Sequence, residues 1–166
     1  MKYFIISVDN NYVAPSPLRW QGILDRKTLH EKKSFQIPEH LLFSVENHMQ
    51  MMYTDIIVFP CFMVSEMVMN VIKKYNPFIK FVRILFYDQE EKRSMIYYLP
   101  FLNKMTGLNC KGNGELVLNR SEWKDRVIGE VEDNKNKLHI VVRMDLAESI
   151  LRRNAIGVGL AEIEAK

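Results

Sequence analysis

The sequence predicts a single α/β domain of the α+β kind over residues 1–166, with a mixed β-sheet and two or three packed helices. Short apolar runs alternate with segments of helical periodicity, which is typical of helices packed on a sheet. The composition, 48% hydrophobic and 26% charged, is that of an ordinary globular protein. A chain of 166 residues buries roughly two-thirds of its unfolded surface. We therefore expect it to fold without disulfides or metal ions.

The first fifty residues have the weakest pattern. Residues 3–8 form an apolar run that predicts a strand, because the run is too short for the core of a signal peptide. Residues 9–30 contain prolines and glycine and are expected to cross the surface irregularly. Apolar residues recur at helical spacing over 34–52 and predict a short helix beginning at Pro38. Residues 1–50 are thus an irregular N-terminal part.

The main α/β core is expected over residues 55–164. It begins with the apolar run 56–59, which predicts a buried strand. A helix is predicted from Ser65 to Tyr75, because serine is a favoured N-cap residue and apolar residues then repeat at helical spacing. The Asn76-Pro77 step is expected to end this helix, since the residue before proline avoids the helical conformation.

Further strands are predicted after this helix. Residues 79–87 and 94–99 are rich in aromatic and β-branched residues and flank a charged turn, so we expect an antiparallel hairpin. Residues 115–119 predict a short strand, and residues 132–137 predict a polar turn.

The last thirty residues predict a compact β-α-β unit. Period-2 alternation over 138–142 indicates a strand, residues 145–153 indicate an amphipathic helix, and a glycine-containing strand follows. We expect Asp145 to be the N-cap of the helix and Glu148 to complete a capping box. Ile150 lies on the apolar face of this helix and is expected to be buried.

No catalytic, cofactor-binding or metal-binding motif is found in the sequence. The histidines have neither His-Glu-x-x-His spacing nor an i, i+4 pair; they are His30, His40, His48 and His139. Cys61 and Cys110 lack Cys-x-x-Cys spacing and predict two buried thiols. We therefore expect no metal and no cofactor.

Two motifs resemble catalytic or phosphate-binding ones but differ in context. Ser65 follows a strand and begins a helix, yet it lacks the glycines of a nucleophile elbow, so an N-cap role is favoured. Gly157-Val158-Gly159 follows a helix instead of opening one, which favours close packing over phosphate binding. Six methionines lie between Met49 and Met69 and are suited either to an irregular core or to an adaptable binding surface.

Charge and hydropathy bear on partners and compartment. The net charge is +3 and the 23 basic residues are interleaved with 20 acidic ones, so we expect no nucleic-acid partner. No apolar stretch reaches the length of a membrane span, so we expect no membrane partner and a cytoplasmic location. The sequence leaves the oligomeric state open.

Three residues of the N-terminal part are candidates for partner binding: Tyr12, Arg19 and Trp20. Tyrosine, arginine and tryptophan are enriched among the residues that anchor protein interfaces. The alternative for Trp20 is that it closes one end of the hydrophobic core.

Over residues 55–164 the layout resembles the bacterial immunity proteins of polymorphic toxin systems. The resemblance is carried by the strand-to-helix step at residues 62–66, the tyrosine-rich return strand 95–100, and the ending that contains Asp145, Leu146, Ile150 and Gly157. It implies a non-catalytic protein that binds and neutralises a cognate toxin. The alternative is a small enzyme whose carboxylates and His139 are dispersed in sequence but meet in space.

Overall fold

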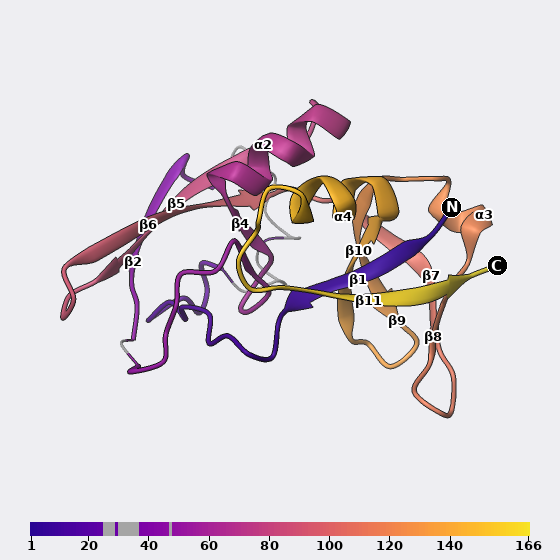
Figure 1. The fold of residues 1–166 in the computed structure, drawn as a ribbon, viewed down its shortest axis with the longest axis horizontal. Helices are drawn as coiled ribbons and strands as arrows, with labels where there is room; N and C mark the ends of the chain where they lie inside the picture. Colours follow the sequence, from indigo (N-terminus) through magenta and orange to yellow (C-terminus); the bar gives the residue numbers. More distant parts are fainter. Residues whose placement is uncertain (25–28, 30–36, 47) are drawn as a thin grey trace.

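The computed structural model describes residues 1–24, 29, 37–46 and 48–166. These residues form a closed six-stranded barrel and a five-stranded sheet, with two helices packed where the barrel and sheet meet (Figure 1). Helices and strands both occur, as predicted, but strands predominate. The predicted single mixed sheet is wrong, because six of the strands close on one another to form the barrel.

The barrel combines strands from both ends of the chain. In order around it, the strands are β1 (Tyr3–Val8), β10 (Leu138–Arg143), β9 (Ile128–Asp133), β7 (Lys104–Cys110), β8 (Leu116–Leu118) and β11 (Val158–Ala165). β1 pairs antiparallel with β10 on one side and with β11 on the other. The predicted C-terminal β-α-β unit is therefore confirmed, with β1 inserted between its two strands.

The barrel interior is filled by large side chains. Helix α3 (Arg120–Trp123) places Trp123 inside, where its ring meets the ring of Tyr3 edge-on at 6.1 Å between centroids. Both side chains are fully buried. A Cβ added to Gly129 of β9 would come within 3.0 Å of Trp123 Cη2, so the glycine makes room for the indole.

The sheet has the order β2-β5-β6-β4-β3. Its strands are β2 (His40–Ser44), β5 (Phe81–Asp88), β6 (Arg93–Pro100), β4 (Met63–Ser65) and β3 (Ile56–Ile57). The β5–β6 hairpin confirms the prediction. The predicted helix over 34–52 is wrong in its described part, because β2 pairs parallel with β5 and buries Phe43 against it. The strand predicted over 56–59 is shorter than expected.

Helix α2 (Glu66–Tyr75) begins and ends as predicted. Ser65 is its N-cap and Asn76 its C-cap, and it buries Val68 and Ile72 between the sheet and the barrel. At its C-terminal end the Tyr75 hydroxyl donates to the carbonyl of Asp145 at 3.0 Å. This hydrogen bond joins α2 to α4 (Met144–Leu151), the helix that crosses between β10 and β11.

Helix α4 (Met144–Leu151) buries Leu146 and Ile150, as expected, but Asp145 is not its N-cap. The helix follows β10 directly, and Arg143 occupies the N-cap position, but its side chain makes no capping hydrogen bond to the first turn of the helix. The guanidinium of Arg143 binds both carboxylate oxygens of Asp145 at 2.8 Å. This bidentate pair holds Asp145 in the first turn, and the predicted capping box does not form.

Residues 9–24 form no helix or strand of their own and run along the side of the sheet away from α2. Isolated bridges join Val13 to Met51 and Pro17 to Val45. Cys61 is buried as predicted, whereas Cys110, at the end of β7, is only half-buried. None of the described helices has the length and apolar character needed to cross a membrane.

Candidate interaction surface

The serine at the strand-to-helix step is held in a structural network. Ser65 Oγ donates to Asp55 Oδ1 at 2.5 Å and accepts from the backbone N–H of Val68 at 3.4 Å. Asp55 Oδ2 accepts from the N–H of Ile156 at 2.6 Å. The pair therefore connects the start of α2 to the loop between α4 and β11, which agrees with the N-cap role predicted for Ser65.

His139 and Asp133 form the closest histidine–carboxylate pair in the described residues, 3.0 Å apart. Asp133 Oδ1 also accepts from the backbone N–H groups of Lys135 and Lys137 at 2.9 Å. Burial opposes the charge, but the hydrogen bonds from Lys137, His139 and Lys135 hold the pKa of Asp133 below its ordinary value. Only 9% of the His139 side chain and 3% of the Asp133 side chain are exposed, so the pair stabilises the β9–β10 turn.

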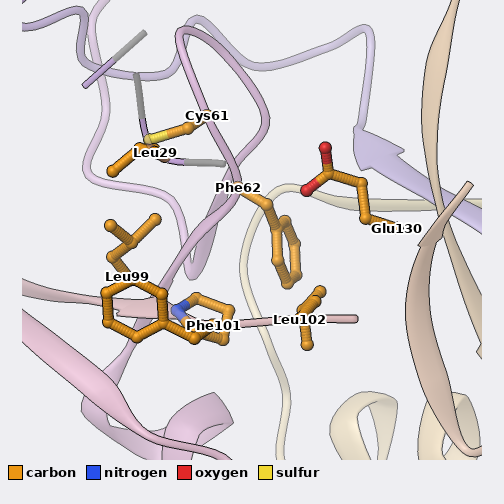
Figure 2. A pocket seen from close by; sticks show the side chains of 8 residues that line it. Leu29, Cys61, Phe62, Leu99, Phe101, Leu102 and Glu130 are labelled. Carbon is orange, nitrogen blue, oxygen red and sulfur yellow. The ribbon is translucent and has the colours of Figure 1, made fainter. Parts of the chain in front are cut away.

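A small apolar cavity lies between the sheet and the barrel. Figure 2 shows Phe62 and Leu102 side by side in its wall, with Glu130 extending toward them from β9. Its volume is about 40 Å³, far below that of a typical ligand pocket. Within the part of the chain that the structure describes, no group of three or more His, Cys, Asp or Glu side chains could hold a metal ion.

A groove of about 870 Å³ lies between α2 and strands β2, β5 and β6. Three cationic side chains line it: Lys73 from α2, Lys80 from the α2–β5 loop, and Arg83 from β5. Phe81 and Tyr98 contribute aromatic surface from the neighbouring strands. We call this site the basic groove.

The charges of the basic groove are not neutralised within the described chain. None of Lys73, Lys80 and Arg83 forms an ion pair there, although Glu39 also lines the groove. Lys73 Nζ lies 5.4 Å from the centroid of the Phe81 ring, within the range of a cation–π contact. Three cations without a carboxylate partner in the described residues, one of them over an aromatic ring, are suited to binding an anionic group.

Phe78 neighbours the basic groove in sequence. It sits in the α2–β5 loop between two residues that line the groove, and it is 91% exposed. A fully exposed phenylalanine gains free energy when a partner covers it. The basic groove and the loop that borders it therefore combine charge with an exposed apolar side chain.

The three predicted partner-binding residues lie elsewhere, along residues 9–24. The Trp20 ring meets the Phe59 ring edge-on at 5.3 Å, and the Trp20 carbonyl accepts from the N–H of the buried Leu24. Arg19 is exposed next to it, whereas Tyr12 packs beside Gly157, in the loop that follows α4. Trp20 thus both contacts the core and borders solvent.

Sequence reasoning missed the basic groove. The segment 78–83 contains the exposed Phe78 and two of the three cations, Lys80 and Arg83. This mixture of aromatic and basic residues is the signal in the sequence that could have indicated the groove. The groove also requires β2 to pair with β5, whereas the sequence pattern predicted a helix over residues 34–52, which include β2.

Two comparisons with known protein sequences find no match for this chain. No protein-family model matches it, and no curated protein sequence matches it. The function is therefore inferred from the geometry of the chain itself.

Proposed function

We propose that this protein is an immunity-type binding protein that neutralises a cognate bacterial toxin by direct, non-catalytic contact. The observation that carries the proposal is the basic groove, whose three cations have no ion-pair partner in the described chain. Two polar pairs could suggest catalysis, but both have structural contacts. Ser65 and Asp55 hold the start of α2, and His139 and Asp133 hold the β9–β10 turn.

The basic groove favours a partner that presents carboxylates beside apolar surface. Complementary charge speeds association and excludes partners of the wrong sign. Burial of exposed aromatic side chains then contributes most of the affinity, because a few anchors usually dominate an interface. Phe78 and Arg83 belong to the residue types found at such anchors.

The test is co-expression with the toxin encoded beside the gene for this protein. The double variant Lys73→Glu/Arg83→Glu reverses two charges of the basic groove and should lose protection, because the partner's carboxylates would then be repelled. Lys74→Glu is the matched control, since Lys74 is exposed on the same helix but does not line the groove.

The melting temperature of each purified variant separates binding from folding. The proposal requires loss of protection with a wild-type melting temperature in the double variant, and full protection in the control. Full protection by the double variant would exclude the groove as the toxin site. Binding of single-stranded oligonucleotides by the wild-type groove, with no binding of the toxin, would assign the site to nucleic acid.

A further inference from the structure

A second cavity, of about 650 Å³, lies at the tip of the β5–β6 hairpin. It opens on the other face of the sheet from the basic groove, because Asp88 shares the side of β5 that carries the buried Phe86. Three carboxylates line it: Asp88, Glu90 and Glu91. The two sides of the hairpin thus carry opposite charge.

Asp88 is the unusual member of this cluster. Its side chain is almost fully enclosed, since the residue is only 1% exposed. Oδ1 accepts from the backbone N–H groups of Glu90 at 3.0 Å and Glu91 at 3.2 Å. Oδ2 is buried and has no hydrogen-bond partner, and in the described chain Arg93, opposite Asp88 in the hairpin, forms no ion pair with it.

A buried carboxylate oxygen without a donor is unfavourable, because it has lost its water and gained nothing in exchange. Oδ2 is closed to solvent in this structure, so a donor that enters the cavity restores the lost hydrogen bond only after the groups around Asp88 shift. The described residues do not gather enough ligands there for a metal ion. The carboxylates also repel phosphate groups. The chemistry that remains is an organic cation that donates hydrogen bonds.

The other walls of the cavity suit the aliphatic part of such a cation. Met51, Met52 and Tyr53 line it, and thioether and aromatic side chains pack well against methylene groups. Met51 and Met52 belong to the six methionines between Met49 and Met69, whose flexible side chains suit either an irregular core or a binding surface. At this cavity they form a wall around a negative charge.

We propose that this cavity receives an arginine or lysine side chain of a protein partner, with its charged group donating to Asp88 Oδ2. The proposal rests on the proposed function for the existence of a protein partner, and it adds the chemistry of one contact. The methylene stem of the incoming side chain lies along Met51, Met52 and Tyr53. Glu91 adds negative charge at the hairpin tip.

The experiment is an NMR titration of the full-length protein with N-acetylarginine amide, in which backbone amide shifts are followed. Saturable shifts are expected at Met51, Tyr53 and Asp88, and N-acetylnorleucine amide, which lacks the charge, should cause none. Asp88→Asn keeps an oxygen for the turn but removes the charge. It should weaken binding of the arginine derivative by at least about tenfold.

Two further variants make the result specific. Glu66→Gln removes one negative charge outside the cavity and should leave the affinity unchanged. Met52→Lys places an ammonium group of the chain at the cavity and should abolish binding, which keeps the test valid if Asp88→Asn fails to fold. Equal affinity in wild type and Asp88→Asn, or shifts spread over acidic residues away from the hairpin, would overturn the proposal.

Arg93 offers an internal alternative. If the derivative binds Arg93→Gln but not the wild type, Arg93 itself fills the cavity and the proposal is wrong. The titration uses no toxin, so its result is independent of the co-expression test. If the wild-type protein gives no protection from the toxin but still binds the arginine derivative, the proposed function is wrong and the cavity proposal stands.

Discussion

Gly157 allows the loop after α4 to pass close to Thr54. Its φ is +72°, and a Cβ at this position would overlap Thr54 Cγ2. The backbone N–H of Asp9 also donates to the Gly157 carbonyl at 3.0 Å. One residue without a side chain therefore permits close packing between the first loop, the segment before β3 and the C-terminal loop.

Gly157→Ala should destabilise the protein more than Gly22→Ala. Gly22 has a similar φ of +75° but no atom within 4 Å of its added Cβ, so both variants share the cost of left-handed backbone, about 1 kcal/mol. Overlap with Thr54 should add about 1 to 3 kcal/mol at position 157. Urea unfolding measures both losses, and equal values would mean that Thr54 moves aside without cost.

Trp20 and Arg19 remain predicted partner contacts. Trp20→Ala and Arg19→Ala should each reduce protection against the toxin while the purified variants keep wild-type melting temperatures. Arg19 is the cleaner probe, because it is exposed whereas Trp20 packs on Phe59. Full protection by both variants would discard this surface, and a collapsed melting temperature for Trp20→Ala would assign the indole to the core.

At the scale of elements, the β9–β10 turn depends on the charge of Asp133. Its folded-state pKa lies below the ordinary value, 3.8, so the ionised form stabilises the native state. This contribution is fully present above the unfolded pKa and is lost as the pH falls through the folded pKa. Asp133→Asn removes the charge at every pH.

We therefore expect the full loss of unfolding free energy in Asp133→Asn above about pH 5, and we expect this loss to shrink below about pH 3.8. Guanidinium chloride unfolding at a series of pH values measures the difference between variant and wild type. A difference that stays constant down to pH 2 would contradict a lowered pKa at Asp133.

The elements that the sequence predicted well are those whose pattern is local. Helix α2, the β5–β6 hairpin, β1 and β10 each carry an apolar periodicity or a cap within their own residues. Strands β7 and β9 were missed because neither has a run of apolar residues: β7 mixes apolar with polar residues around Gly107, and half of the residues of β9 are acidic. The strands that pair with β7 and β9 include ones distant in sequence, so no local pattern predicts these pairings.

Local rules also failed where a tertiary contact competes with them. Asp145 and Glu148 have capping-box spacing, but Arg143 at the end of β10 takes the carboxylate of Asp145 instead. The basic groove was missed for a similar reason. Its cations were visible in the sequence, but the pairing of β2 with β5 that gathers them was not.

At the scale of the whole molecule, helices α2 and α4 join the barrel to the sheet. One hydrophobic cluster contains Val64 of the sheet, Val68 and Ile72 of α2, Ile150 of α4 and Ile140 of the barrel. The barrel interior and the far side of the sheet have separate clusters. The shared cluster should make the two sheets unfold together.

Ile150→Ala tests this coupling. Ile150 is buried in the shared cluster, so the variant should lose about 2 to 5 kcal/mol through lost apolar burial and a residual cavity. The two tryptophans report on separate regions, since Trp123 lies in the barrel and Trp20 beside the sheet. In a Trp20→Phe background, fluorescence follows the barrel alone.

The fluorescence transition of that background should coincide with the loss of far-UV circular dichroism, with and without Ile150→Ala. Two separate midpoints would show that the barrel and the sheet unfold independently. A midpoint unchanged by Ile150→Ala would place the apolar face of α4 outside the shared cluster.

The pairing of β1 with β10 and β11 has a consequence during synthesis. Tyr3 is paired with Arg143 and Ile163, so both neighbours of the first strand are among the last parts of this chain to be made. At about 5 to 20 residues per second, β1 waits on the order of ten seconds for a partner. Throughout that interval its unpaired backbone N–H and C=O groups and its apolar side chains are open to other nascent chains, so β1 is a target for a ribosome-bound chaperone.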